Sequence, residues 1–253
     1  MSYPTRDSAS DVWSLRDVYK AEAGDVWPVA DSDIYFANVS LLINADGETN
    51  GSTNIVDASN NAYSITVSGN AQIDTATFKY GDGSLEFDGA DDYLTVTSGS
   101  GLFQFDGDFT IECWVKTGVF SQDVVFRRIL SNGADASNSI QLVFYNGSTA
   151  SSSLTVRSNI NHIIGSTTVA DNNWHHVALT REGTSLKLFI DGVQDGSTAT
   201  TSQVFNANDT FVIGRYYTGN GDFNGFIDDL RITKGVARYT ANFTPPTKAL
   251  PTS

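Results

Sequence analysis

Tight-turn dipeptides constrain this chain more than any other feature. Of its 22 glycines, eleven follow Asp or Asn, in six Asp-Gly and five Asn-Gly pairs. Such pairs adopt the positive φ angles of two-residue hairpin turns and are the strongest local signal of a β-hairpin. The acidic residues agree, because 24 are Asp and only five are Glu, whereas helices favour Glu over Asp. The sequence therefore predicts an all-β protein with many short strands.

Short apolar or alternating segments recur between these turns. In the segment 186–190, Leu186, Leu188 and Ile190 share one face, as the two-residue period of a strand requires. Regular spacing of such segments indicates a sandwich or a barrel rather than βαβ units. We expect strands at 40–44, 62–68, 84–88, 93–97, 109–116, 129–131, 140–145, 153–157, 175–181, 185–190, 211–214 and 226–233.

The two ends of the chain differ from the middle. Residues 1–39 read as an extended arm with one short helix at about 14–23, capped by Ser14 and ended by Gly24. Residues 236–253 contain three prolines and read as an extended strap, which leaves 40–235 for the β domain. The arm either packs onto its own domain or docks on another chain. Its candidate anchoring side chains are Trp13, Val18, Tyr19, Trp27, Tyr35 and Phe36.

Charge and hydropathy exclude several classes of partner. The formal net charge is −14, which opposes binding to a phosphate backbone or to an anionic membrane surface. No apolar run approaches the ~18 residues of a membrane span, and the polar N-terminus lacks the apolar region of a signal peptide. The single Cys113 lies in an apolar run, which indicates a buried, inert thiol.

Five segments resemble, in the same order, the motifs of laminin-G-like, concanavalin A-like jelly rolls. They are Ser84–Leu94, Phe109–Val115, Trp174–Arg181, Leu186–Gly192 with its Asp-Gly turn, and Ile227–Ile232. The resemblance covers about residues 40–235. It implies two curved antiparallel sheets packed face to face, similar in shape to legume lectins.

The ends carry a second, less specific resemblance. Asp11–Pro28 and Lys234–Pro246 look like segments of structural proteins of tailed bacteriophages. This implies a virion component, as a tail fibre, spike or capsid decoration, which assembles in the host cytoplasm. Residues 1–39 would then contact other virion proteins. Such proteins are commonly homo-oligomers and frequently trimers, although the chain has no heptad repeat to drive trimerisation.

A catalytic role is not expected. Some glycoside hydrolases of this fold use an E-x-D-x-x-E strand motif, of which Glu86 and Asp88 supply only the first two carboxylates. His175 and His176 are adjacent on a strand and point to opposite faces, so they cannot easily chelate one ion.

The laminin-G-like resemblance implies one structural calcium ion. It points to the loop after Asp57, including Asn60, and to an acidic residue on the final strand, Asp228 or Asp229. Asp46 is a further candidate. Strand alternation allows only one of the last pair to face inward, and we favour Asp228. The alternative is that these residues only form turns.

Glycan binding is the function most consistent with the resemblance. A sugar site needs an aromatic platform with amide and carboxylate partners. The candidates are Tyr216, Tyr217, Asn220 and Asp222, with Asn132 and Tyr145 as neighbours. The alternative is that this loop merely connects two strands. We therefore expect a non-catalytic, glycan- or surface-binding virion protein, with a bacterial lectin or adhesin, or a glycoside hydrolase, as alternatives.

Overall fold

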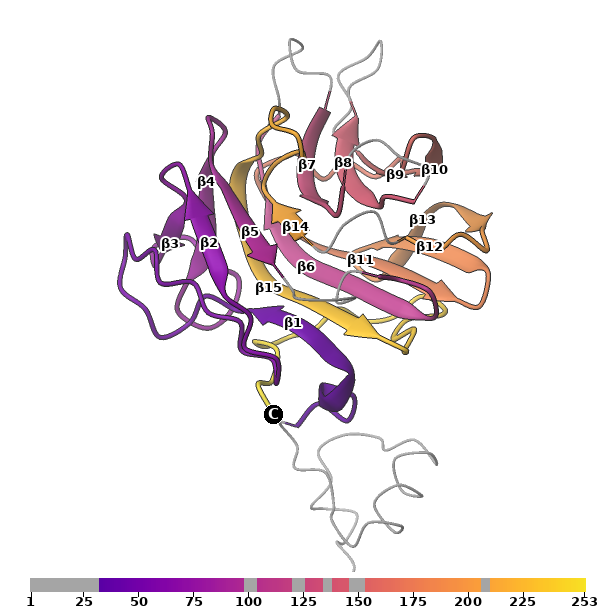
Figure 1. The fold of residues 1–253 in the computed structure, drawn as a ribbon, viewed down its shortest axis with the longest axis horizontal. Coiled ribbons are helices and arrows are strands. Elements are labelled where there is room, and N and C mark those ends of the chain that lie inside the picture. Colours follow the sequence, from indigo (N-terminus) through magenta and orange to yellow (C-terminus); the bar gives the residue numbers. More distant parts are fainter. Residues whose placement is uncertain (1–31, 98–103, 120–125, 134–137, 146–152, 206–209) are drawn as a thin grey trace, which may run out of the picture.

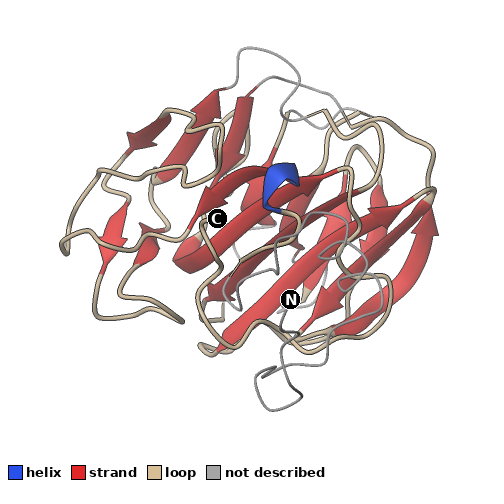
Figure 2. Cartoon of the chain, turned by 90° about the horizontal axis from the view of Figure 1, so that it is seen from below, coloured by secondary structure: helices blue, strands red, loops and turns tan. Residues whose placement is uncertain are grey.

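Two antiparallel β-sheets packed face to face make up the protein in a computed structural model (Figure 1). The structure describes residues 32–97, 104–119, 126–133, 138–145, 153–205 and 210–253. Figure 2 shows that this part of the chain is strand and loop apart from one 3-10 turn at Phe36–Asn38. The predicted helix at about 14–23 lies outside the described residues.

The first sheet, sheet A, has eight strands, and seven of them follow the order β13-β12-β11-β6-β15-β4-β3. The eighth, β1, pairs with the second half of β15, whereas β4 pairs with its first half. The strands are β1 (Val39–Ile43), β3 (Gln72–Asp74), β4 (Ser84–Asp88), β6 (Phe109–Lys116), β11 (Trp174–Glu182), β12 (Ser185–Ile190), β13 (Val193–Thr200) and β15 (Asn224–Lys234).

The second sheet, sheet B, has seven strands in the order β10-β9-β8-β7-β14-β5-β2. Strand β14 pairs with β7 and β5 although both are distant from it in sequence. The chain therefore crosses between the two sheets in the segments that connect these strands. The strands are β2 (Ile65–Ser68), β5 (Tyr93–Thr97), β7 (Phe126–Ser131), β8 (Gln141–Tyr145), β9 (Leu154–Arg157), β10 (Asn161–Ile164) and β14 (Thr210–Ile213).

The predicted all-β jelly-roll sandwich is confirmed, and each of the twelve predicted segments corresponds to a strand. The three strands that the sequence did not indicate are β3, β10 and β13. Strands β10 and β13 close one end of their sheets, and β3 closes the other end of sheet A. Edge strands face fewer apolar neighbours, so their sequences carry little of the alternation that predicts a strand.

The core lies between the sheets and contains the inward-facing residues of the predicted alternations. Phe109, Ile111, Cys113 and Val115 of β6 are all at most 1% exposed. Cys113 is the inert thiol that the sequence predicts, since burial raises the pKa of its thiol above the usual value. No helix in the described part of the chain is long and apolar enough to cross a membrane.

The C-terminal strap, residues 235–253, covers the outer face of sheet A. It crosses β6, β11 and β12 towards β13 and then returns to β15. Within it, the Tyr239 and Phe243 rings stack with their centroids 3.6 Å apart. The bonds that mark this path run from Arg238 N to Thr110 Oγ1, Thr180 Oγ1 to Tyr239 O, Gln194 N to Asn242 Oδ1, and Leu250 N to the Asp229 carboxylate. The strap thereby buries an apolar and polar surface that would otherwise face water.

A buried carboxylate, that of Glu112 on β6, joins the strap to the sheet. Glu112 Oε1 accepts hydrogen bonds from Arg231 Nε and Nη2 at 3.0 and 2.8 Å. Its Oε2 accepts one from the Tyr239 hydroxyl at 2.7 Å and lies 3.2 Å from His176 Nε2. Burial alone would raise the pKa of Glu112, but the charge of Arg231 and the hydrogen bond with His176 outweigh it, so the pKa is well below its usual value.

Asp33 extends this network to the segment that precedes β1. Its carboxylate lies 2.9 Å from Arg231 Nη1 and 2.6 Å from Arg238 Nη2, and its backbone N–H donates to the carbonyl of Ser253. Residues 33–38, which the sequence assigns to the arm, therefore contact the sandwich.

Replacing Glu112 with Gln tests how far the fold depends on this network. The change leaves Arg231 buried without its main counter-charge, so we expect the free energy of unfolding to fall by about 3 kcal/mol or more. Denaturation in urea measures the difference. The matched change at the exposed Glu182 should alter the free energy by less than about 0.5 kcal/mol. An unfolding free energy of Glu112→Gln equal to that of Glu182→Gln would contradict the account.

Candidate functional site

The loop between β14 and β15, residues 214–223, holds most of the predicted sugar-binding residues. It is closed by backbone bonds from Tyr216 N to Asn220 O, at 3.1 Å, and from Gly219 N to Tyr216 O, at 2.9 Å. Asn220 has a φ of +87°, which explains an Asn-Gly pair at this turn. Tyr217 is 36% exposed and Asn220 is exposed, so both face solvent.

Tyr216 is half-buried, and an arginine occupies one side of its ring. The guanidinium carbon of Arg128 on β7 lies 3.8 Å from the Tyr216 ring centroid and 5.1 Å from that of Phe126. Arg157 of β9 lies 4.6 Å from the Phe126 centroid. The sequence analysis missed Arg128 because it began the strand at Ile129, three residues after β7 begins. Arg157 lies in a predicted strand, but its closeness to Phe126 depends on the pairing of distant strands.

Asp222 lies beside two further arginines. Its Oδ1 is 2.9 Å from Arg215 Nε, and its backbone carbonyl accepts a hydrogen bond from Arg127 Nη1 at 2.6 Å. Arg215 also lies over the Tyr93 ring, with 5.0 Å between the guanidinium carbon and the ring centroid. The loop 214–223 therefore meets β7 and β5 through arginines and aromatic rings.

The two predicted neighbours of this loop have different positions. Asn132 is fully buried, and its Oδ1 accepts the backbone N–H of Ile140, which closes the connection between β7 and β8. It is held in the interior and does not present its amide to a surface ligand, so we leave it out of the site. Tyr145 pairs with Phe126 across β7 and β8, but its side chain lies outside the described residues.

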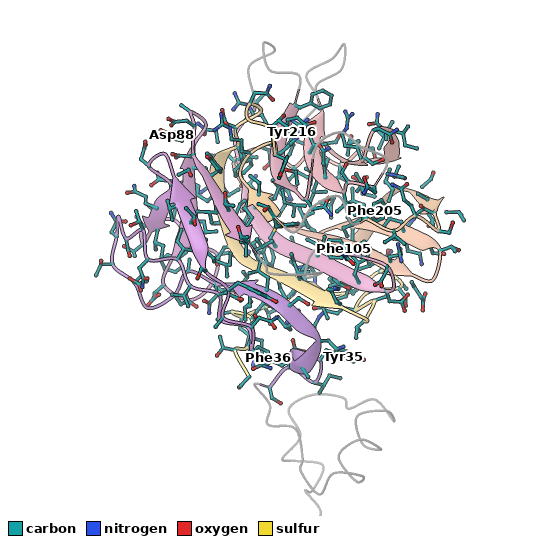
Figure 3. All side chains as sticks on the ribbon, viewed as in Figure 1. Tyr35, Phe36, Asp88, Phe105, Phe205 and Tyr216 are labelled. Atoms are coloured by element: carbon teal, nitrogen blue, oxygen red, sulfur yellow. The ribbon has the colours of Figure 1, made fainter. Side chains whose placement is uncertain are left out.

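The predicted anchoring residues that the structure describes lie at the other end of the molecule. In Figure 3, Tyr35 and Phe36 lie at the pole opposite Tyr216. Phe36 packs against Val39, Leu42 and Leu250, and the Arg238 guanidinium carbon lies 5.4 Å from the Tyr35 ring centroid. These two aromatics pack on their own domain. Trp13, Val18, Tyr19 and Trp27 lie outside the described residues.

A β-bulge sets the geometry of the acidic pair on the final strand. The register between β15 and β6 shifts between Asp228 and Arg231, and Asp229 has a φ of +49°. Both aspartates are 1% exposed. Both are therefore buried because the bulge interrupts the alternation at this point, and the choice of Asp228 over Asp229 as the metal ligand stays a prediction.

The charge of this pair is poorly compensated by the side chains around it. Asp228 Oδ2 accepts the backbone N–H groups of Lys79 and Tyr80, but its buried Oδ1 has no hydrogen-bond partner among the described residues. Burial raises the pKa of Asp228 to about 7, and burial with the charge of Asp228 raises that of Asp229 to about 8. Asp46 lies close enough to raise both pKa values further. Calcium prefers oxygen ligands, and Asp228 offers an unpartnered buried one. The oxygens of Asp46, Asp228 and Asp229 do not, however, all lie within 4.8 Å of one another as those of a three-carboxylate group do elsewhere in the described residues.

The loop that begins at Asp57 fits a cation less well. The Asp57 carboxylate already accepts hydrogen bonds from the backbone of Leu42, Ser59 and Tyr63 and from the Ser59 hydroxyl. These bonds hold the loop against β1. Asn60 is exposed. The structure does not bring Asp57, Asn60 and Asp228 together as one ligand set among the described residues.

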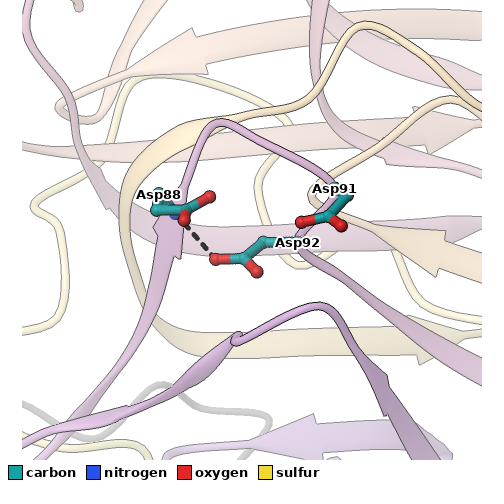
Figure 4. Close-up of side chains that lie close together, drawn as sticks. All are labelled: Asp88, Asp91 and Asp92. Atoms are coloured by element: carbon teal, nitrogen blue, oxygen red, sulfur yellow. Dashed lines mark hydrogen bonds between the residues drawn. The ribbon is translucent and has the colours of Figure 1, made fainter.

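Three carboxylates do come together at the turn between β4 and β5 (Figure 4). Ligand atoms of Asp88, Asp91 and Asp92 lie within 4.8 Å of one another. Asp92 is buried and accepts the backbone N–H groups of Asp88 and Asn70, and Asp88 accepts that of Ala90. Glu86 accepts a hydrogen bond from Gln72. These bonds give the carboxylates of the partial E-x-D motif a role in shaping the turn.

The two adjacent histidines lie in different environments, as the strand period predicts. His176 is 1% exposed beside Glu112. His175 Nδ1 lies 2.7 Å from Asp191 Oδ2, and its Nε2 lies 3.1 Å from Asp171 Oδ1. Burial would lower the pKa of His175, but hydrogen bonds to the two carboxylates outweigh it and raise the pKa. Neither histidine belongs to a group of three metal-ligating side chains in the described part of the chain.

Several solved structures have a similar fold, and two of them come from bacterial proteins that the chain matches over about half of their length. The binding domain of Paraclostridial Mosquitocidal Protein 1 is 17% identical, with a TM-score of 0.63 over 81% of this chain and 51% of that one. A botulinum neurotoxin type C structure, whose title links cell entry to two ganglioside molecules, is 15% identical, with a TM-score of 0.59 over 80% and 49%. This chain thus spans about half the length of the toxin domains.

A third similar structure matches over nearly its whole length. Domain 4 of AbnA, a GH43 extracellular arabinanase from Geobacillus stearothermophilus, was solved in complex with arabinotriose. It is 19% identical to this chain, with a TM-score of 0.57, and the match covers 80% of this chain and 95% of that domain. At these identities the likeness shows the fold alone.

Sequence comparison identifies the family. No curated protein matches the chain. The family described as the concanavalin A-like lectin/glucanases superfamily matches residues 88–238, which are more than half of the 253 residues. The match agrees with the two-sheet sandwich and with the five motifs in register. The chain therefore belongs to the concanavalin A-like lectin/glucanases superfamily.

Proposed function

We propose that this protein is a non-catalytic carbohydrate-binding domain of a bacteriophage particle. Residues 1–31 hold it to the particle, and it binds a surface glycan at the loop 214–223. The observation that carries the proposal is the placement of these features. Tyr216 lies at one pole, and Tyr35 and Phe36, next to the arm, lie at the other (Figure 3). A domain held at the second pole presents the first to a host surface.

Carbohydrate binding is supported by the side chains of the loop and by the family. Tyr217 offers an exposed aromatic ring, and Asn220 and Asp222 offer polar groups beside it. An aromatic ring with nearby polar groups is the usual composition of a sugar site. The AbnA domain, solved with arabinotriose, has the same fold over 95% of its length. The toxin domains match over about half of their length, so their ligands support the proposal less directly.

A role without catalysis is supported by the state of the candidate carboxylates. Glu86 and Asp88 are engaged by Gln72, Asn70 and the backbone of the turn. Retaining and inverting glycosidases need a carboxylic acid and a second carboxylate on either side of the scissile bond. Glu86 instead bonds across the β3–β4 pair, and Asp88 bonds to Asn70 and to the backbone of the turn, which supports a structural role for both.

The virion context is supported by the phage-like segments near both ends of the chain. Asp33, which follows residues 1–31, donates its backbone N–H to the carbonyl of Ser253. We propose that the domain assembles in the host cytoplasm as a homo-oligomer, with a trimer expected, and that the arm makes the contacts to other virion proteins.

Replacing Tyr217 with Ala tests the glycan site. Loss of an exposed stacking ring should weaken glycan binding by about tenfold or more, equivalent to at least ~1.4 kcal/mol. A glycan array followed by titration calorimetry measures the affinity. Phe78→Ala is the matched control, because Phe78 is 39% exposed and lies outside the loop 214–223. Equal glycan affinity of the Tyr217 and Phe78 variants would place the site elsewhere.

Deleting residues 1–31 tests the anchoring role. The deletion spares Asp33 and its ion pairs, so we expect the sandwich to keep its melting temperature within a few degrees. The truncated chain should be absent from purified particles that contain the full chain, as measured by mass spectrometry. Normal incorporation of the truncated chain would refute anchoring by the arm. Absence of the full chain from every particle would instead favour a lectin or adhesin module of a bacterium.

We also propose that one calcium ion binds at the buried pair Asp228 and Asp229. A bound cation would neutralise two adjacent buried carboxylates and fix the bulge of β15 to the loop before β4, which donates to Asp228. The role of the ion is structural, since Asp229 also accepts the backbone N–H of Leu250 in the strap.

Calcium should therefore raise the melting temperature by several degrees, and EGTA should reverse the change. A ligand that binds only the folded state raises the free energy of unfolding by about 2.7 kcal/mol when its concentration is ~100 times its Kd. Asp228→Asn should abolish this response. In EGTA the variant should be at least as stable as the native chain, because it removes repulsion with Asp229. Asn60→Ala should keep the full response. A melting temperature that ignores calcium, or a response lost only in Asn60→Ala, would contradict the site.

A further inference from the structure

An arginine–aromatic cluster lies next to the loop 214–223. It consists of Phe126, Arg128, Arg157 and Tyr216, held by the contacts of 3.8 to 5.1 Å between guanidinium carbons and ring centroids described above. Arg128 also donates from Nε to Gln141 Oε1 at 2.8 Å.

The cluster lies on the face of sheet B that turns away from the core. Gln141 pairs with Arg157 across β8 and β9, whereas the next residues along these strands, Leu142 and Val156, belong to the core. Because successive side chains alternate between faces, Gln141 and Arg157 share the outer face. Arg128 is buried at 2% exposed, and Arg157, Phe126 and Tyr216 are half-buried.

The distribution of arginines over the chain sets this region apart. From residue 32 onward there are seven arginines, and four of them, Arg127, Arg128, Arg157 and Arg215, lie in or beside the cluster. Of these four, Arg215 and Arg127 lie beside Asp222. The other three lie near acidic residues elsewhere: Arg231 and Arg238 beside Asp33 and Glu112, and Arg181 beside Asp106 and Asp108. A chain of net charge −14 thus gathers most of these arginines where we place the glycan.

We propose that the glycan bound at this pole is acidic and that Arg157 donates hydrogen bonds to its carboxylate. The inference rests on the proposed carbohydrate-binding function and specifies its ligand as a saccharide that carries carboxylate groups. A guanidinium group matches a carboxylate in planarity and can donate two parallel hydrogen bonds to it.

The stacking of the arginines on aromatic rings favours this role. A guanidinium already oriented on a ring loses less conformational freedom when it binds a ligand than a lysine on a flexible stem. Arg128 is held between Phe126 and Tyr216 and positions those two rings. Arg157, which is half-buried and also lies over the Phe126 ring, is the arginine that contacts the ligand. The remaining negative charge of the protein would repel the same ligand from most other surfaces.

A glycan array with paired members tests the proposal on the full-length chain. Each acidic member, such as trigalacturonate or 3′-sialyllactose, is matched by its methyl ester or its neutral parent. We expect binding to the acidic members and little to their neutral counterparts. A sulfated member of the same array distinguishes a carboxylate-specific site from a general anion site. Tighter binding of the sulfated member than of the carboxylated members would overturn the carboxylate assignment.

Variants then assign the recognition to Arg157. Arg157→Gln should weaken binding of acidic members about ten- to a hundredfold, the range for one charge-assisted hydrogen bond, without changing binding of neutral members. Arg157→Lys should restore part of the loss, because it keeps the charge but not the planar fork. Lys248→Gln, which removes one positive charge from the strap, is the control and should change neither.

The outcomes separate the two levels of the proposal. Equal binding of acidic and neutral members would overturn the acidic ligand but keep carbohydrate binding. Equal losses for both kinds of member in Arg157→Gln would assign Arg157 a structural role and overturn its part in recognition. Binding to no member of the array would overturn the proposed function together with the inference.

Discussion

The buried carboxylate of Glu112 is the interaction on which the arrangement of the molecule depends. A jelly roll buries one face of each sheet in its core and leaves two outer faces for water or for other contacts. On sheet A, Glu112 lies in the middle strand β6 and is held by Arg231 from β15 and by Tyr239 from the strap. A lone buried charge is costly, so the network is stable only when the strap is in place. The strap therefore closes the outer face of sheet A.

Outside that face, the loop 214–223 and the adjoining part of sheet B carry the exposed Tyr217 and the half-buried Arg157. Phe78 and Lys79 form a second place where an exposed aromatic ring adjoins a half-buried basic side chain. The same network ties the start of the sandwich to its end, because Asp33 binds both Arg231 and Arg238. The arm thus leaves the domain at a fixed point, opposite Tyr216. One set of buried ion pairs joins the start of the sandwich, its final strand and the strap.

Much of the fold follows from patterns that a single strand expresses by itself. Alternation in β6 and β12 and the Asp-Gly turns mark strands and hairpins because they depend on neighbours in sequence. Features that depend on pairing between distant strands escaped prediction. The bulge at Asp229 arises where β15 exchanges β4 for β1 as its partner, and no local pattern marks it. Asn132 resembles a surface turn residue, yet its amide closes a buried connection. Arg128 lies just before an apolar run, and only the fold brings it to Tyr216.

The most direct test of the account is hydrogen–deuterium exchange of the full chain with and without a bound saccharide. Binding at the proposed pole should slow amide exchange in residues 126–128, in 154–157 and in the loop 214–223. It should leave exchange in the strap, residues 236–253, unchanged, because the strap is already bound to sheet A. Protection that appears in the strap or on β11 and β12, with none at 214–223, would contradict the assignment of the binding pole.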